Sequence, residues 1–430
     1  MNTSRRSFLK AAGATGLFNI IPAKTLWGET APSNQLTRAI IGFGAAAHGD
    51  CHLSHKGSRL VGLCDPFASR VEEGLECAEK AGWGKIKAYG NFAELIADSG
   101  VDIVHVCTPP HWHGVQCVMA SRAGKAVWCE TPMSRTVGEG KRILESVKAK
   151  KCMFRVSSAV RASDEPLGNS GLTPRRARHL VAAGAFGKGP LRCVVGEGQG
   201  FPWNFAWAGR VKQAVEPLPE GFDYEMWLGP APWRPYSGHR VGRSFRGYWD
   251  YDSGALGDTG QQYLDPVQYV LGKDEESPVA VDYAGPFQHP EAVGFFNRIT
   301  LSYADGTEVV LDGDGSLRNE PFIRGSALSS NDVAQPPEAG SKLGRLLADT
   351  PEPPPLTDDF VESVRTQSPF CLNEDRAFRS ATMVNLASAA WRTGRGFKFD
   401  QVSFCAEGCP AANRFLHQST REPWRTEMAI

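Results

Sequence analysis

The stretch RAIIGFGAAA, residues 38–47, decides the fold. It begins as a short apolar run typical of a buried parallel strand, and it then turns at Gly42 and Gly44 toward a helix, with Ala47 in the third glycine position of the motif. Backbone amides at the start of such a helix bind a pyrophosphate, which a side chain at either glycine would obstruct. The stretch therefore predicts a dinucleotide-binding turn.

A carboxylate follows the next apolar run at the spacing that this turn requires. Asp65 ends the run at residues 60–64, 21 residues after Gly44. An acid at this place accepts hydrogen bonds from the adenosine ribose hydroxyls and repels a 2′-phosphate. We therefore expect NAD as the cofactor, while Arg70 leaves NADP as the weaker alternative.

Strand-like and helix-like segments alternate along the first part of the chain. Apolar runs at residues 103–107 and 126–129 are separated by helix-length segments, which indicates a doubly wound parallel sheet in an α/β protein. Later runs flank the turn at residues 304–306 and predict an antiparallel hairpin. We expect a second, α+β domain with a large, open, mostly antiparallel sheet, and a homo-oligomer formed through that sheet.

We divide the chain into four parts. The expected helices of the first domain cover residues 68–81, 92–98 and 113–123. The parts are a signal segment (1–31), a nucleotide-binding domain (36–155), a substrate domain (156–400) and a tail (401–430).

The N-terminal residues indicate a compartment. SRRSFLK at residues 4–10, followed by an apolar run to Ile21, matches a twin-arginine export signal, so we expect a periplasmic protein. No later run is long enough to span a bilayer, so no stable membrane span is expected after signal cleavage. Most of the 11 cysteines should be free thiols, although Cys405 and Cys409 could pair.

Charge argues against one class of partner. The chain carries 47 basic and 47 acidic residues, and its only tight basic group is Arg175, Arg176 and Arg178. Nucleic-acid binding requires a clustered basic surface, so no nucleic-acid partner is expected.

Three further motifs resemble those of the Gfo/Idh/MocA family of nicotinamide-dependent sugar oxidoreductases. They are TPPHWH (108–113), CETPM (129–133) and GDTGQQYLD (257–265), and the similarity runs from about residue 36 to 424. The resemblance implies a carbohydrate substrate. It also implies that four residues lie at the cofactor, namely Thr108, His111, His113 and Glu130. Two histidines without a third ligand predict no metal site.

The chain departs from the family pattern at its acid-base positions. The usual lysine of Glu-Lys-Pro is Thr131, and the usual histidine of the last motif is Gln262, whereas the acid Asp258 is kept. Neither replacement transfers a proton at ordinary pH. Asp258 is therefore the candidate base, with Thr131 and Gln262 orienting the hydroxyl, and Asp265 is expected to cap or brace a helix over residues 266–271.

The sequence leaves three functions open. The first is an NAD(P)-dependent oxidoreductase acting on a sugar or sugar derivative. The second is an NAD-dependent glycosidase or lyase that oxidises its substrate transiently with no net redox change. The third is a non-catalytic sugar-binding protein that NAD stabilises.

Overall fold

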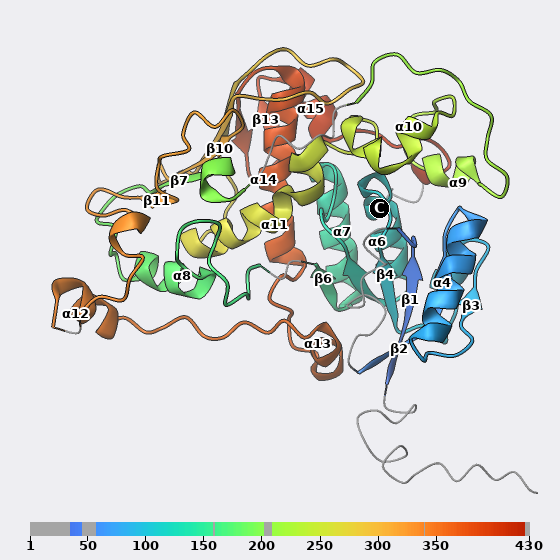
Figure 1. The fold of residues 1–430 in the computed structure, drawn as a ribbon, viewed down its shortest axis with the longest axis horizontal. Helices are drawn as coiled ribbons and strands as arrows, with labels where there is room; N and C mark the ends of the chain where they lie inside the picture. Colours follow the sequence, from blue (N-terminus) through green and yellow to red (C-terminus); the bar gives the residue numbers. More distant parts are fainter. Residues whose placement is uncertain (1–34, 45–56, 158–159, 202–208, 339, 426–430) are drawn as a thin grey trace, which may run out of the picture.

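The computed structural model describes residues 35–44, 57–157, 160–201, 209–338 and 340–425 (Figure 1). The predicted signal segment and Ala47 lie outside these residues. Within the described ranges, no helix combines the length and the apolar character that crossing a membrane requires.

The N-terminal half is built on a six-stranded parallel sheet with the strand order β3-β2-β1-β4-β5-β6. The direction of winding reverses between β1 and β4, which places a ligand-binding crevice at the carboxyl ends of these strands. The predicted doubly wound sheet is confirmed. Its strands are β1 (Leu36–Ile41), β2 (Ser58–Cys64), β3 (Lys87–Ala88), β4 (Ile103–Val106), β5 (Ala126–Cys129) and β6 (Phe154–Val156).

The three helices expected at residues 68–81, 92–98 and 113–123 agree with the structure to within one residue. Every residue of β4 and β5 is buried, as expected for strands covered on both faces. The hydroxyl of Thr136 accepts a hydrogen bond from the Glu139 amide and so caps the N-terminus of α7. The helices of this half are α4 (Ala68–Lys80), α5 (Phe92–Ala97), η2 (Pro110–Trp112), α6 (His113–Arg122) and α7 (Val137–Lys150).

The second half contains a seven-stranded sheet with the order β11-β7-β10-β9-β8-β12-β13. All of its pairs are antiparallel except β7 with β10, which confirms the predicted mostly antiparallel sheet and its β9–β10 hairpin. Its strands are β7 (Arg192–Gly196), β8 (Ala280–Ala284), β9 (Arg298–Ser302), β10 (Glu308–Asp312), β11 (Ile323–Arg324), β12 (Phe397–Asp400) and β13 (Cys405–Glu407).

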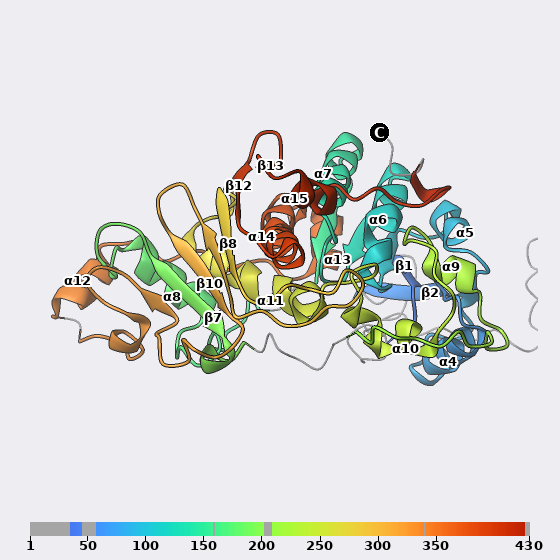
Figure 2. The same cartoon turned by 90° about the horizontal axis from the view of Figure 1, so that it is seen from above.

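Two long helices lie between the sheets (Figure 2). They are α11 (Gly254–Leu271) and α14 (Glu374–Thr393), which pack against each other. α14 also contacts α7 of the first half and β8 and β9 of the second, so the two sheets share one apolar core. The shorter elements are α8 (Pro174–Ala182), η3 (Glu197–Gln199), α9 (Tyr224–Leu228), α10 (Gly238–Val241), η4 (Arg243–Gly247), η5 (Ser330–Asp332), α12 (Lys342–Ala348), α13 (Phe360–Thr366) and α15 (Pro410–Leu416).

The helix expected over residues 266–271 begins 12 residues earlier, at Gly254, and Pro266 lies inside it. Asp265 is consequently no cap. It lies fully buried in the helix and accepts hydrogen bonds from Arg161, with Nη2 to Oδ1 at 2.6 Å. It therefore braces α11 against the segment that follows β6.

The cysteines within the described residues are free thiols, Cys405 and Cys409 among them. The pairing considered from the sequence therefore does not occur in this structure.

The C-terminal segment returns to the first half of the chain (Figure 2). Arg421 donates hydrogen bonds to the Gly229 carbonyl, at 2.9 Å from its Nη2. The ring of Trp424 lies 4.8 Å from that of Trp112 and 5.6 Å from that of Phe92. The tail thus ties the end of α9 to the nucleotide-binding half.

Candidate active site

A cavity of about 400 Å³ lies at the carboxyl ends of the parallel strands. Its floor comes from the residues that follow β1, β2, β4 and β5, and its other walls come from α9, η4 and the first turns of α11. Both halves of the chain therefore build one site. Most of the predicted site residues line it, namely Gly42, Gly44, Asp65, Thr108, Glu130, Thr131, Asp258 and Gln262.

The glycine turn has room for a nucleotide. Gly42 has a φ of +88°, which side chains rarely adopt, and a Cβ added there would lie 2.9 Å from the Cys107 carbonyl oxygen. At Gly44 a Cβ would meet no atom of the described residues within 4 Å. Because Gly44 lines the cavity, that open space belongs to it, and the turn fits a group that must approach the backbone closely.

Asp65 supports the turn from the end of β2. Its Oδ2 accepts a hydrogen bond from the Phe43 amide at 2.7 Å, and its Oδ1 accepts one from the Phe67 amide at 2.9 Å. Burial raises the pKa of Asp65, against the lowering effects of Arg70 and of these amides. Each carboxylate oxygen keeps a second lone pair for a ribose hydroxyl.

His111 and His113 do not line the cavity. Both are buried behind it, where His111 Nε2 lies 2.9 Å from the Trp227 carbonyl oxygen. His113 Nδ1 and Nε2 lie 2.6 and 2.8 Å from the carbonyl oxygens of Pro132 and Thr108. Burial lowers the pKa of His111 to about 3 and also lowers that of His113. The two imidazoles therefore position the loops that form the walls.

The residues at the two altered acid-base positions bond to each other. Gln262 Nε2 donates to the Thr131 hydroxyl at 3.1 Å, which joins α11 to the turn after β5. This bond fixes an amide and a hydroxyl that both face the cavity. The arrangement orients a substrate hydroxyl, but neither group takes up its proton.

Asp258 supplies a carboxylate at the same wall. Its Oδ1 lies 2.7 Å from Arg246 Nε, and about a fifth of each side chain is exposed. Burial raises the pKa of Asp258, while Arg246 and His113 act in the opposite direction. The carboxylate is therefore a stronger base than an exposed aspartate.

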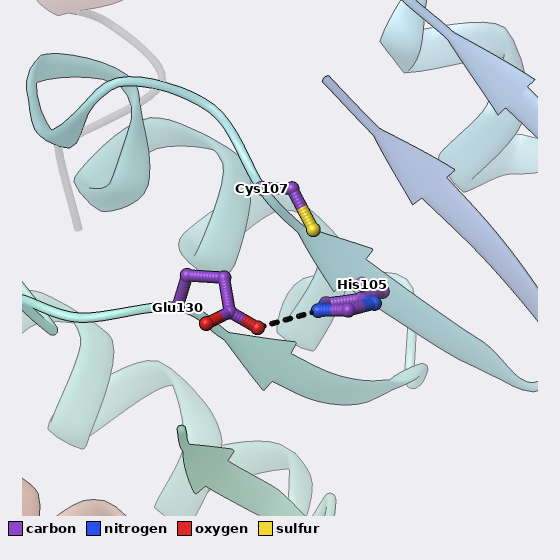
Figure 3. A group of neighbouring side chains, drawn as sticks. All are labelled: His105, Cys107 and Glu130. Carbon is purple, nitrogen blue, oxygen red and sulfur yellow. Dashed lines mark hydrogen bonds and ion pairs between the residues drawn. The ribbon is translucent and has the colours of Figure 1, made fainter. Parts of the chain in front are cut away.

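Glu130 ends a hydrogen-bonded chain that starts at Arg38 in β1, and Figure 3 shows its last link, from His105 to Glu130. His105 Nε2 lies 2.7 Å from its Oε1, and Arg38 Nη1 lies 3.1 Å from His105 Nδ1. Because a guanidinium only donates, His105 Nδ1 accepts, and Nε2–H donates to Glu130. Ser157 donates to the same oxygen at 2.8 Å.

The cluster of His105, Cys107 and Glu130 has metal-ligand chemistry, with potential ligand atoms within 4.8 Å of one another (Figure 3). His105 and Glu130 are already bonded to each other, and the buried Arg38 guanidinium adjoins them. A divalent cation would have to replace these bonds beside a fixed positive charge. The cluster therefore functions as a brace for Glu130.

Sequence reasoning missed Arg38, His105 and Arg246. The first two left a signal, since each interrupts an apolar run in one of two neighbouring strands. Arg38 pairs with Ile103 and Ile40 with His105, so that alternate positions on one face bring the two polar side chains together. Arg246 left no comparable signal in its arginine-rich loop.

Comparisons with known proteins agree with this architecture. Residues 36–158 match the Gfo/Idh/MocA family described as "Oxidoreductase family, NAD-binding Rossmann fold", and residues 170–426 match its "C-terminal alpha/beta domain". The chain therefore belongs to the Gfo/Idh/MocA oxidoreductase family and has its NAD-binding domain.

Individual relatives share shorter stretches. A D-xylose 1-dehydrogenase (NADP(+)) from Hypocrea jecorina is 36% identical over 120 residues, which cover 28% of each chain. An alpha-N-acetylgalactosaminidase from Shewanella oneidensis is 31% identical over 181 residues, which cover 36% of this chain and 39% of the relative. The match thus spans well under half the length of either relative.

Solved structures share the fold. The WlbA dehydrogenase from Bordetella pertussis, in complex with NADH and UDP-GlcNAcA, superposes with a TM-score of 0.52 at 16% identity, covering 85% of this chain and 98% of that one. The myo-inositol 2-dehydrogenase from Lactobacillus plantarum gives a TM-score of 0.52 at 17% identity, covering 85% and 100%.

Proposed function

We propose that the protein is a periplasmic, NAD-dependent oxidoreductase that acts on a sugar or sugar derivative, with Asp258 as its acid-base residue. The observation that supports this most is that Asp258 and the glycine turn line one cavity. Bound NAD accepts or supplies the hydride. Asp65 favours NAD over NADP, because its carboxylate repels a 2′-phosphate. Arg70, the residue that would attract this phosphate, lies 3.9 Å from the Asp65 carboxylate and is paired with it.

Side chains of the protein itself transfer the proton of the substrate hydroxyl. In oxidation, Asp258 accepts the proton of the substrate hydroxyl, while Gln262 and Thr131 hold that hydroxyl by hydrogen bonds. Arg246 keeps the carboxylate oriented toward the cavity. In the reverse direction, protonated Asp258 returns the proton to the keto oxygen.

Product analysis tests this proposal. The full chain is incubated with NAD and a panel of sugars, and products are identified by mass spectrometry alongside NADH absorbance. We expect an oxidised sugar with matching NADH, and a loss of about 10²–10⁴-fold in rate for Asp258→Asn. An Asp258→Asn variant that turns over at the wild-type rate would contradict the assignment of the base.

A glycosidase working through transient oxidation is the second candidate. It is favoured by the bonded Thr131 and Gln262 pair, which leaves no ordinary acid-base partner at these positions, and by the similarity to a galactosaminidase. In the same assay it releases a free sugar with no accumulation of NADH. The non-catalytic alternative predicts sugar-dependent thermal stabilisation without any product.

A periplasmic location rests on Arg5 and Arg6. Changing both to Lys should leave a folded protein in the cytoplasm, as shown by cell fractionation. A double variant that is still fully exported would contradict this part of the proposal.

The uncovered face of the second sheet is the surface we propose for a second copy of the chain. α14 contacts one face of β8 and β9, and the other face carries Arg192, Asp282, Arg298 and Glu308 around a shallow hollow. Charges of both signs on one flat surface suit self-association about a two-fold axis. Sedimentation analysis should give a dimer that Arg298→Glu weakens. A monomeric wild-type protein would contradict the proposal.

A further inference from the structure

A second carboxyl lies close to the start of α11, six residues before Asp258. Asp252 precedes α11 and is only 1% exposed. Its Oδ1 accepts a hydrogen bond from the Ser253 amide at 2.7 Å. Its Oδ2 is buried and has no hydrogen-bond partner among the described residues. A buried carboxylate with an unpartnered oxygen is costly, whereas a protonated carboxyl avoids most of that cost.

A glycine in α11 allows this placement. A Cβ added at Gly257 would lie 2.0 Å from Asp252 Oδ1 and 3.0 Å from its Cγ. The Asp252 carboxyl therefore packs against the turn of helix from which the next residue, Asp258, enters the cavity. Only glycine at residue 257 leaves room for the two carboxyls to approach in this way.

The neighbouring charged groups act differently on Asp258 and on Asp252. Arg246 of η4 makes its ion pair with Asp258. Arg135, before α7, donates a hydrogen bond to the Trp249 carbonyl at 2.9 Å and acts on Asp252 only through its field. His113 of α6 acts on Asp258. Burial, and next the charge of Asp258, raise the pKa of Asp252 well above its ordinary value against the pull of both arginines.

We propose that Asp252 and Asp258 work as one carboxyl pair that holds a single proton at neutral pH, with Asp252 protonated and Asp258 charged toward the cavity. Two adjacent carboxyls cannot both ionise at low cost, so environment separates their roles. Asp252 is a positioning residue that acts through Asp258. The pair takes the place of the acid-base residues that Thr131 and Gln262 cannot supply.

This inference rests on the proposed function for its chemistry. In oxidation, the O–H bond of the substrate breaks and its proton forms an O–H bond on Asp258. The C–H bond of the same carbon would break as well, with its hydride taken up by bound NAD, and the C–O bond would become a carbonyl. The pair then holds two protons, one of which passes to water in the cavity and restores the starting state. Reduction follows the same steps in reverse.

Infrared spectroscopy of the full chain tests the pair without requiring turnover. At neutral pH, the spectrum of the wild-type protein minus that of Asp252→Asn should contain the carbonyl band of one protonated carboxylic acid. Asp250→Asn is the matched control, because Asp250 is buried and ion-paired with Arg234 at 2.8 Å and should contribute no such band. A difference spectrum without the band overturns the proposal.

A second variant keeps the test decisive if Asp252→Asn does not fold. In Asp258→Asn, the neighbouring negative charge is removed, so the Asp252 band should disappear at a lower pH than in the wild type. If the Asp252 band disappears at the same pH in Asp258→Asn as in the wild type, the proposed carboxyl pair is wrong. A protein with the band but no product from any sugar contradicts the proposed function alone, whereas turnover without the band contradicts the pair alone.

Discussion

Two single-residue changes in the glycine turn should separate folding from nucleotide binding. Gly42→Ala forces a side chain into a backbone with φ of +88° and places its Cβ 2.9 Å from a backbone oxygen. Strain of this kind costs about 1–3 kcal/mol of folding free energy. Gly44→Ala meets no atom within 4 Å in the part of the chain that the structure describes, so stability without ligand should stay within about 0.5 kcal/mol of wild type.

The effect on NAD should be the opposite. The new methyl group at residue 44 enters the cavity that the glycine turn lines. At NAD about 100 times above Kd, binding adds about 2.7 kcal/mol to the stability of the wild-type protein. If the methyl group weakens binding about 100-fold, the same NAD concentration adds only about 0.4 kcal/mol.

Urea unfolding of nucleotide-free protein, with and without NAD, measures both quantities for each variant. The reasoning is refuted if Gly44→Ala keeps the full NAD-dependent stabilisation. It is equally refuted if Gly42→Ala is as stable as wild type without ligand.

Three further outcomes follow from the charged and titrating groups. Because burial raises the pKa of Asp258, kcat for sugar oxidation should fall as pH drops through that raised value, where the base form is lost, and a pH–rate profile checks this. Asp265→Ala should cost about 3 kcal/mol in chemical denaturation, since buried Arg161 then keeps Asp274 alone as an ion-pair partner among the described residues. The folded pKa of His111 is about 3 and its ordinary value 6.5, so its contribution to stability is complete above pH 6.5 and is lost as pH falls toward 3. The unfolding free energy falls by up to about 1.4 kcal/mol per pH unit in this range. In His111→Gln, denaturation measured across pH should show a smaller dependence of the unfolding free energy on pH.

The fold was predictable from local patterns in the sequence. The parallel strands and the glycine turn were predictable because each is encoded in contiguous residues, and Asp65 was predictable because it directly ends a strand. The start of α11 was not, because Pro266 imitates a helix beginning while the residues before it already form helical turns. Most residues of α11 are buried, so tertiary packing stabilises the helix across Pro266, and the sequence does not display that packing.

The electrostatics of the site depended on pairs far apart in the chain. Arg38 and His105 meet only because β1 and β4 are neighbours in the sheet. Arg246 and Asp258 meet only because η4 packs against α11. Asp252 became notable only once its burial was known, since carboxylates next to serine and glycine are common in exposed loops.

The returning tail bears on how such proteins can be recombined. Because Trp424 of the C-terminal tail contacts Phe92 and Trp112, the nucleotide-binding half cannot be exchanged independently of the tail. A chimera that takes this half from a relative must also match the aromatic residues to the tail. A fusion partner attached after residue 430 must leave that contact undisturbed.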